Sequence, residues 1–340
     1  MQRLFFWGII LLVLIIVALI IDQVFYRLIR LFLCKQTAQI VRIVTFCAVI
    51  VTLVTSYYIG HNYTRFQIEV TSAEITSSRI PAGFDGYKIA QISDFHISSF
   101  DADKDKQFFN DLITRIREQK PDIIVFTGDL VSMRAAEAYP FRNALARLTA
   151  ETGIPLYSIL GNHDYADYMR GFDDQRRKQD VDSLIAIQQQ AGWTMLNNQS
   201  TYIYNKEDSI ALVGVENIGE PPFSVYGDLS KAMESVGGKD IADSIFTILL
   251  SHNPIHWRSE VIPHTHIDLT LSGHTHAMQF KIGNWSPSKW KYPEWSGLYQ
   301  EEGQYLYVNT GLGCVGPSVR IGVKPELTIL TLHAASSLLP

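Results

Sequence analysis

The chain begins with two long uncharged stretches and then changes to a finer pattern of apolar and polar positions. Residues 4–21 and residues 43–60 are each 18 residues long and carry no charged side chain. As α-helices they would each be about 27 Å long, which is close to the hydrocarbon thickness of a bilayer. The pattern therefore predicts a membrane anchor over residues 1–63, with two transmembrane helices at 4–21 and 43–60.

Two alternatives to this anchor are a signal peptide and a single span. A signal peptide would have a shorter apolar core and a small-residue cleavage site, but the bulky Phe25-Tyr26 follows here. Four basic residues lie between the stretches and only Arg3 precedes them, so the positive-inside rule places the connection in the cytoplasm. The large domain is then expected outside the cytoplasm, at the cell membrane. If residues 22–35 formed an interfacial helix and only one span existed, this orientation would reverse.

From residue 64 onward, short apolar runs alternate with helical periodicity. Patterns typical of β-strands occur at residues 65–76, 87–93, 122–127, 154–160, 193–196, 201–204, 209–215, 244–250, 266–271, 304–308 and 326–332. Helical spacing of apolar residues occurs at 105–119, 140–148, 181–190 and 254–260. Residues 283–303 are rich in Trp, Tyr, Pro and Ser and are predicted to form a long ordered loop. The alternation predicts one layered α/β domain over residues 64–340.

Composition and charge exclude several classes of protein. The chain is 47% hydrophobic with a formal net charge of −5, which is not the composition of a disordered chain. Three cysteines cannot form a disulfide scaffold. Residues 1–60 hold five Lys/Arg and one acid, which leaves 24 Lys/Arg against 33 Asp/Glu in residues 61–340. An acidic body without a basic run argues against nucleic-acid binding.

Polar clusters follow five of the predicted strands. The carboxyl ends of strands in an open α/β sheet face one edge, where ligands bind, so these clusters are expected to meet there. The five clusters are Ser93-Asp94-Phe95-His96, Thr127-Gly128-Asp129, Gly161-Asn162-His163-Asp164, Ser251-His252-Asn253-Pro254 and Ser272-Gly273-His274-Thr275-His276. Their oxygen and imidazole donors, without a thiolate, suit Mn, Fe, Zn or Ni. Seven or more donors exceed the need of one ion, so two divalent ions are predicted.

The spacing within the clusters has physical reasons. Asp94 and His96 are two residues apart, so both point to one side at a strand end, and His274 and His276 share this relation. The glycines of the clusters let the backbone turn sharply beside the site. Two cations about 3.5–4 Å apart can hold a phosphate and activate water, and a nearby imidazole could protonate the leaving group. Any one cluster alone is more typical of a turn, and the five in order indicate the metal centre.

The five clusters resemble the motifs of the calcineurin-like metallophosphoesterase family, which run D-x-H, G-D, G-N-H-[DE], H and G-H-x-H. The match extends from about residue 87 to residue 332. The resemblance implies a four-layer α-β-β-α sandwich in which two sheets are flanked by helices. It also implies a two-metal centre that hydrolyses a phosphodiester or a phosphomonoester.

The resemblance assigns a role to each residue of the motifs. Asp94, His96 and His276 correspond to ligands of the first metal, and Asn162, His252 and His274 to ligands of the second. Asp129 corresponds to the bridging carboxylate. His163 corresponds to an acid-type histidine that contacts the phosphate, and Asp164 is expected to orient it. The family resemblance implies in-line attack on phosphorus by a metal-bound hydroxide.

Within the family, the sequence is most similar to the membrane-anchored bacterial branch of YkuE- and YaeI-like phosphoesterases. That branch typically has G-H-T-H-G-G-Q, whereas Ala277-Met278 replace the double glycine here. A later run matches through Gly297-Leu298-Tyr299, Tyr307-Val308-Asn309, Gly311-Leu312-Gly313 and Pro317-Ser318-Val319-Arg320. Arg320 is interpreted either as a cation on the phosphate side or as a surface or ion-paired arginine.

The sequence thus predicts a membrane-anchored phosphoesterase. The anchor keeps the active site near the bilayer, which favours a phospholipid-type or lipid-linked substrate among the alternatives. Two other functions stay open, a pyrophosphatase acting on a nucleotide-linked lipid, as in UDP-diacylglucosamine hydrolysis, and a non-catalytic membrane protein with a structural metal site. The Trp/Tyr-rich residues 283–303 could form a small satellite core, a wall of the substrate cleft or a contact with the membrane interface.

Overall fold

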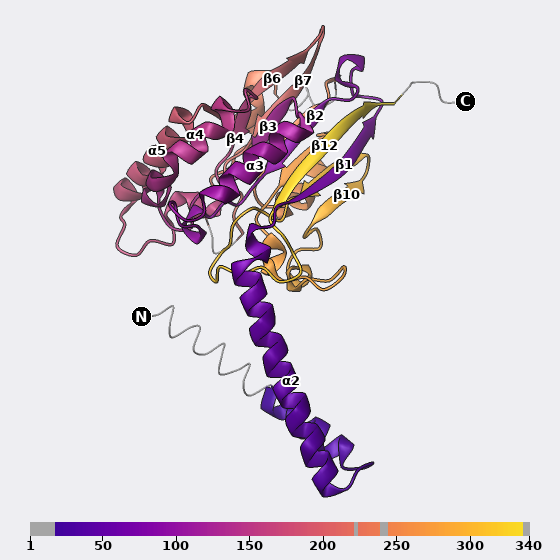
Figure 1. Cartoon of the computed structure of the whole chain (residues 1–340). Coiled ribbons are helices and arrows are strands. Elements are labelled where there is room, and N and C mark those ends of the chain that lie inside the picture. Colours follow the sequence, from indigo (N-terminus) through magenta and orange to yellow (C-terminus); the bar gives the residue numbers. More distant parts are fainter. Residues whose placement is uncertain (1–17, 221–223, 239–243, 336–340) are drawn as a thin grey trace, which may run out of the picture. The chain divides into compact units, whose positions relative to one another are not determined.

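The chain forms two compact units, Met1–Ile59 and Gly60–Pro340. The computed structural model describes residues 18–220, 224–238 and 244–335. In the first unit, residues 18–29 are helical, and a second helix, α2, extends over Lys35–Asn62 (Figure 1). Within the described residues, α2 is the one helix that is long and apolar enough to cross a membrane.

The predicted span at residues 43–60 lies within α2. Most of the predicted span at residues 4–21 lies outside the described residues. Between the two apolar stretches, Arg42 and Asp22 form an ion pair in which the Arg42 Nε donates to both carboxylate oxygens, at 3.0 and 2.8 Å. The Arg42 guanidinium also lies over the ring of Tyr26, at 5.0 Å from its centroid. These contacts join the helical residues 18–29 to α2.

The second unit contains two six-stranded sheets. The first has the order β1-β12-β2-β3-β4-β5, and the second has the order β10-β11-β9-β8-β7-β6. Strands β2 to β5 run parallel, as do β11, β9, β8 and β7. The strands are β1 Glu69–Ser77, β2 Lys88–Ile92, β3 Ile123–Phe126, β4 Leu156–Ser158, β5 Trp193–Met195, β6 Gln199–Asn205, β7 Asp208–Gly214, β8 Thr247–Leu250, β9 Leu269–Ser272, β10 Gly297–Glu301, β11 Gln304–Val308 and β12 Glu326–Ala334.

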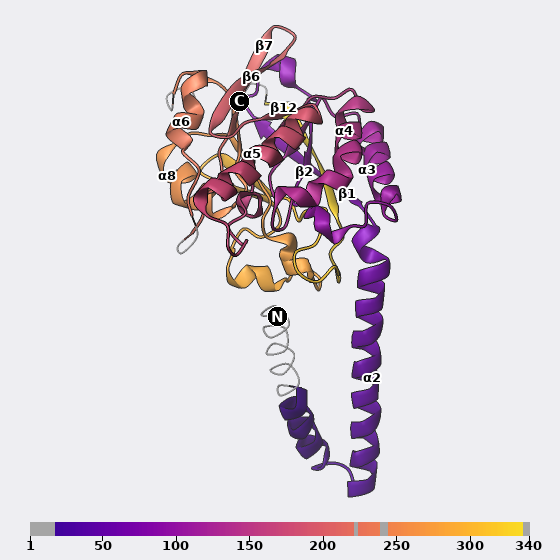
Figure 2. The same ribbon diagram turned by 90° about the vertical axis from the view of Figure 1, so that its left-hand side faces the viewer.

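The two sheets pack face to face, and helices cover both outer faces. An apolar core that includes Ile89, Val125 and Leu250 fills the space between the sheets. The outer face of the first sheet packs against one group of helices, and the outer face of the second sheet against another (Figure 2). These helices are α3 Lys106–Gln119, α4 Arg142–Ala150 and α5 Asp174–Gln190 on the first sheet, and α6 Leu229–Met233 and α8 Ile262–His264 on the second. The structure therefore confirms the part of the predicted fold class that concerns this domain, a mixed α/β fold with two sheets.

Local patterns explain most of these elements, and two departures have a physical cause. Helix α5 begins seven residues before the predicted start at residue 181, because Asp173 caps it by accepting the backbone N–H of Arg176 at 2.8 Å. Strand β10 lies within the predicted loop 283–303. It is a mostly exposed edge strand, joined to β11 by a tight turn in which Glu302 and Gly303 both have positive φ.

Candidate metal centre

The carboxyl ends of strands from both sheets meet at one edge of the domain. Strands β2, β3 and β4 of the first sheet lead into the clusters at 93–96, 127–129 and 161–164, and β8 and β9 of the second lead into those at 251–254 and 272–276. Three groups of potential ligand atoms form there, and the atoms of each group lie within 4.8 Å of one another. One of them, His96, Asp129 and His163, shares a residue with each of the other two, which are Asp94, His96 and His276, and Asp129, His252 and His274.

Asp129 lies between these two groups. Its Oδ2 is 3.4 Å from the Nε2 of His96 and 3.1 Å from the Nε2 of His252, while its Oδ1 accepts the backbone N–H of His163 at 2.8 Å. In the other group, the Nε2 of His276 is 3.2 Å from an oxygen of Asp94. One carboxylate thus faces imidazoles of both groups, which is the arrangement that a bridging ligand requires.

Three buried polar atoms at this edge have no hydrogen-bond partner among the described residues. They are the Nε2 of His96, the Nε2 of His276 and the Oδ1 of Asn162. A buried polar atom without a partner is costly, and each of these atoms carries a lone pair that a divalent ion would engage. The residues therefore fit a metal centre.

The charges at the site agree with metal binding. Burial lowers the pKa of His96 to about 4 and, together with His252, that of His274 to about 3, so both rings are neutral at pH 7. Burial opposes ionisation of Asp129, but His252 and His163 hold its pKa well below the usual range. Against its own burial, the Asp129 carboxylate raises the pKa of His252 to about 9. Neutral imidazole and ionised carboxylate are the forms that bind metal, so His252 would release its proton when an ion binds.

The surroundings of His163 and Asp164 differ from the prediction. The ring of His163 is oriented by the backbone, since its Nδ1–H donates to the carbonyl oxygen of Ser132 at 2.7 Å. Asp164 instead accepts the backbone N–H groups of Asp129 and Gly161, both at 2.9 Å, and that of Val131 at 3.1 Å. Burial and the Asp129 carboxylate raise the pKa of Asp164 to about 7. Asp164 is therefore a positioning residue for the main chain of the ligand loops.

Two tyrosines hydrogen-bond to the candidate ligands, and the sequence singled out only Tyr292, as part of the Trp/Tyr-rich segment. The Nδ2 of Asn162 donates to the hydroxyl of Tyr168 at 2.8 Å, which turns the amide oxygen toward the site. The hydroxyl of Tyr292 is 2.8 Å from the Nε2 of His274, so that ring presents its Nδ1 to the metal group. Groups that hydrogen-bond to metal ligands orient them and raise their basicity. Both tyrosines come from irregular segments, where no periodicity marks them.

The calcineurin-like phosphoesterase family matches residues 87–278 of the chain. The chain belongs to this family. The uncharacterized metallophosphoesterase YkuE of Bacillus subtilis is 31% identical over 290 residues, which cover 82% of this chain and 91% of that protein. A transmembrane protein with metallophosphoesterase domain from Bos taurus is 29% identical over 277 residues, covering 78% of this chain and 57% of that protein.

A further relative is the UDP-2,3-diacylglucosamine pyrophosphatase LpxG of Chlamydia trachomatis. It is 28% identical over 296 residues, covering 72% of this chain and 83% of that protein. Membership of the calcineurin-like family and the buried Asp/His groups make this chain a metal-dependent phosphoric ester hydrolase. They also confirm the predicted cofactors, two divalent metal ions.

In this calcineurin-like domain, glycines give the ligand loops room. A Cβ on Gly161 would lie 2.2 Å from the Oδ1 of Asp129, and a Cβ on Gly273 would lie 2.2 Å from the Oδ2 of Asp94. The candidate ligands themselves are unusual, because five of them have a left-handed backbone. These five are Asp94, His96, Asp129, His274 and His276. Backbone strain of this kind clusters at functional sites.

The position of Arg320 corrects one interpretation of this residue. It is not a surface arginine, because the whole side chain is buried, and its Nη2 lies 3.5 Å from the Nδ1 of His276. Its Nη2 donates to the carbonyl oxygens of Thr310, Gly311 and Gly313 at 3.0, 2.9 and 2.6 Å. Arg320 therefore fixes the 310–313 turn, in which Gly311 lies against Asp94 and His276.

Two cavities open beside the metal centre of this phosphoesterase. The smaller one, about 190 Å³, is lined by residues that include Asn162, His163 and His274, and by Lys291 and Tyr292 of the Trp/Tyr-rich segment. That segment therefore forms one wall of this cavity. The larger cavity, about 410 Å³, shares no lining residue with the smaller one.

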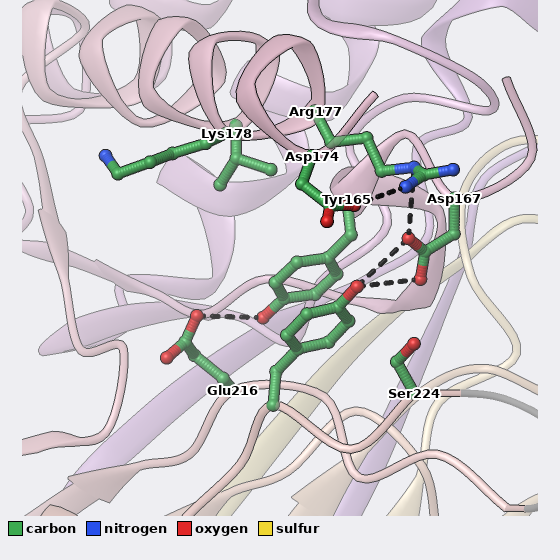
Figure 3. A pocket seen from close by; sticks show the side chains of 9 residues that line it. Tyr165, Asp167, Asp174, Arg177, Lys178, Glu216 and Ser224 are labelled. Atoms are coloured by element: carbon green, nitrogen blue, oxygen red, sulfur yellow. Dashed lines mark hydrogen bonds and ion pairs between the residues drawn. The ribbon is translucent and has the colours of Figure 1, made fainter. Parts of the chain in front are cut away.

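The larger cavity is lined by stacked tyrosines and charged side chains (Figure 3). The rings of Tyr165 and Tyr226 lie 3.9 Å apart and almost parallel. The hydroxyl of Tyr165 donates to Glu216, and that of Tyr226 to Asp167, at 3.2 and 2.9 Å. Tyr165 directly follows the cluster at 161–164, but no candidate ligand lines this cavity.

Proposed function

We propose that this protein is a membrane-attached phosphoesterase whose two metal ions are held between its two sheets. Asp94, His96 and His276 would hold one ion, and Asn162, His252 and His274 the other. Asp129 would bridge the two ions. One observation carries the proposal. Buried nitrogen and oxygen atoms without a hydrogen-bond partner gather at one edge of the domain, with Asp129 between them.

When bound, two divalent ions supply positive charge for a phosphate and activate the attacking water. The side chains of this domain position the groups that exchange protons. Because the Nδ1–H of His163 is held by the Ser132 carbonyl, its Nε2 is the ring atom left to exchange a proton at the cleft. His163 would thus hold the proton that the leaving oxygen takes up, as an acid-type catalyst.

The substrate we propose is a phosphoester that is accessible at a membrane surface. The apolar helix α2 and the transmembrane relative support membrane attachment. A second candidate, cleavage of a diphosphate in a nucleotide-linked lipid, is favoured by the LpxG relative. Both candidates use the same ions and the same acid, and they differ in the leaving group.

Metal loading and turnover of purified full-length protein test the catalytic proposal. Mn-loaded wild-type protein should hydrolyse bis-p-nitrophenyl phosphate, and Asp129→Asn should lose both metal and turnover. His163→Ala should keep its metal while its kcat falls by about 10²–10⁴-fold. His264→Ala, an exposed histidine away from the site, is the control. A wild type that binds no divalent metal and shows no turnover with any of them would refute the proposal.

The membrane topology we propose has two spans, with the catalytic domain on the extracytoplasmic side. The Asp22–Arg42 ion pair lies where the first apolar stretch ends and the second begins. This pairing supports one charged hairpin, residues 22–42, on a single side of the membrane. Its basic residues favour the cytoplasm.

Cysteine labelling in intact cells tests this topology. Cys34 is exposed in the connection between the helices, so an impermeant maleimide should reach it only after lysis. A cysteine appended after Pro340 in a Cys34→Ser chain should be labelled without lysis. The reverse pattern would place the domain in the cytoplasm, and labelling of both positions from one side would indicate a single span.

A further inference from the structure

A cluster of large apolar side chains is exposed on the second unit. Met278, Ile282, Trp285 and Trp290 expose 61%, 65%, 39% and 81% of their surface. The rings of Trp285 and Trp290 contact each other edge to face, with centroids 5.6 Å apart. We refer to these four side chains, with Lys281 and Lys289 between them, as the 278–290 patch. Contiguous exposed apolar surface of this kind marks an interaction site.

The patch is held by ordered backbone and is fixed relative to the metal centre. Ser286 donates through its hydroxyl to the carbonyl oxygen of Ala277 at 2.6 Å, and Ser288 donates to that of Thr275 at 3.3 Å. Thr275 lies between the candidate ligands His274 and His276. Trp295, in contrast, is buried with Ala277 and Val323 in a small core. The Trp/Tyr-rich segment therefore has a buried half that supports it and an exposed half with no covering element among the described residues.

The charge of the patch is opposite to that of the domain that carries it. Between Asp268 and Glu294 there is no acidic residue, and the patch itself carries Lys281 and Lys289, whereas the adjacent Lys291 pairs with Glu220 at 3.2 Å. The domain as a whole is acidic, with 33 Asp/Glu against 24 Lys/Arg in residues 61–340. Exposed tryptophans flanked by lysines match the interface of an anionic bilayer, where Trp lies at headgroup level and lysines meet lipid phosphates.

The place of the patch in the second unit is consistent with a bilayer as its partner. Lys281 and Ile321 are joined through the backbone, since the Lys281 N–H donates to the Ile321 carbonyl at 2.9 Å. The neighbouring Arg320 N–H contacts the carbonyl of Gly60, which is the first residue of this unit and lies near the end of α2. On its other side the patch continues into Lys291 and Tyr292, which line the substrate cleft.

We propose that the 278–290 patch docks the catalytic domain onto an anionic lipid surface, with Trp285 and Trp290 at the level of the headgroups. The docking rests on the membrane attachment proposed above, but it does not depend on hydrolysis. It places the cleft at Lys291 and Tyr292 beside the headgroups, so a phosphoester carried by a lipid can enter without leaving the bilayer.

Quenching of tryptophan fluorescence by brominated lipids tests the docking in the full-length chain. Trp7→Phe removes the tryptophan of the first apolar stretch, and this background is reconstituted in phosphatidylcholine vesicles with and without phosphatidylglycerol. Brominated acyl chains should quench the background chain, and adding Trp285→Ala and Trp290→Ala should abolish most of that quenching. Lys281→Glu with Lys289→Glu should reduce the quenching chiefly in the anionic vesicles. Equal quenching with and without the two patch tryptophans would overturn the proposal.

Turnover separates this proposal from the catalytic one. The Trp285→Ala/Trp290→Ala variant should hydrolyse soluble bis-p-nitrophenyl phosphate at the wild-type rate, since neither ring lines the cleft. Its turnover of a p-nitrophenyl phosphodiester with a long alkyl chain, embedded in the same vesicles, should fall severalfold. A wild type without turnover refutes the catalytic proposal and leaves the quenching result in force. A variant that matches wild type on the embedded substrate contradicts docking.

Discussion

The carboxylate of Asp164 accepts a hydrogen bond from the backbone N–H of Asp129, 35 residues earlier in the chain, at 2.9 Å. The same carboxylate accepts the N–H groups of Gly161 and Val131. It thereby ties the loop after β3 to the loop after β4. Since Asp129 faces both ligand groups, Asp164 would help to hold the ligand loops in place for both proposed ions.

Replacing Asp164 by alanine should therefore destabilise the domain and empty the metal centre. Three buried N–H groups would lose their acceptor, which should cost about 2–4 kcal/mol of unfolding free energy. Thermal unfolding and metal analysis of Asp164→Ala would measure both effects. His163→Ala leaves these three hydrogen bonds in place and is the matched control, with near wild-type melting and metal content. If Asp164→Ala kept its metal and lost only leaving-group protonation, Asp164 would act on His163 instead.

The hydroxyl of Tyr292 should set the affinity of the ion that His274 binds. Tyr292→Phe removes the hydrogen bond to the Nε2 of His274 and keeps the ring. Loss of such an outer partner weakens metal binding by about 10–100-fold. Turnover measured against free Mn²⁺ should show a higher half-saturating concentration, with activity largely restored at high Mn²⁺. Tyr204→Phe, which alters an exposed tyrosine on β6, should leave the curve unchanged, and an unchanged curve for Tyr292→Phe would contradict the role.

A glycine at position 278 should stabilise the protein. Met278 has φ of +44°, a left-handed conformation that costs a residue with a side chain about 1–2 kcal/mol, and its side chain is mostly exposed. Met278→Gly should therefore raise the melting temperature by about 2–4 °C per kcal/mol recovered. Gln179→Gly, in the regular helix α5, should lower it. A lower melting temperature for Met278→Gly would mean that packing of the Met278 side chain outweighs the strain.

Asp268 should make stability fall as the pH rises through the mildly acidic range. Burial raises its pKa to about 6 from 3.8, so between these values the folded state binds more protons than the unfolded state. The contribution is complete below pH 4 and is lost by about pH 6, a loss of up to about 3 kcal/mol. Asp268→Asn keeps an acceptor for the Thr247 N–H and should lack this decline.

Melting temperatures of wild type and Asp268→Asn between pH 4 and pH 7 would test this prediction, since the other titrating groups cancel in the difference. Asp103→Asn, at an exposed carboxylate, is the control, and its curve should stay parallel to wild type. A constant difference between wild type and Asp268→Asn across this range would contradict the prediction.

Much of the fold and most of the donor set were predictable because their signals are local. Each ligand cluster directly follows a short apolar run, and parallel strands bring their carboxyl ends to one edge whatever the details of packing. The sequence therefore identified Asp94, Asp129 and His252 without knowledge of the contacts between them. The ranges of β2, β3 and β11 agree closely with the predicted strands for the same reason.

The parts that escaped prediction depend on contacts distant in sequence or on irregular backbone. Tyr292 reaches His274 from a loop that has no periodicity, and Asp164 binds main-chain groups instead of its neighbouring ring. The burial of Arg320 was not predictable, because a sequence does not indicate that three carbonyl groups surround a guanidinium. Strand β10 is an exposed edge and lacks the alternation that marks a half-buried strand.

The group of Asp94, His96 and His276 and the group of Asp129, His252 and His274 each take side chains from both sheets, so bound ions would join the two halves of the sandwich along one edge. Without bound ions, imidazoles and carboxylates face one another at that edge, and some of their buried polar atoms lack a hydrogen-bond partner. The edge should therefore open more often. Opening exposes main chain to proteases. We therefore expect the amount of this protein in a cell, as well as its activity, to decline when the cell is starved of the metal. Nutrient metal supply would then control the enzyme through its lifetime.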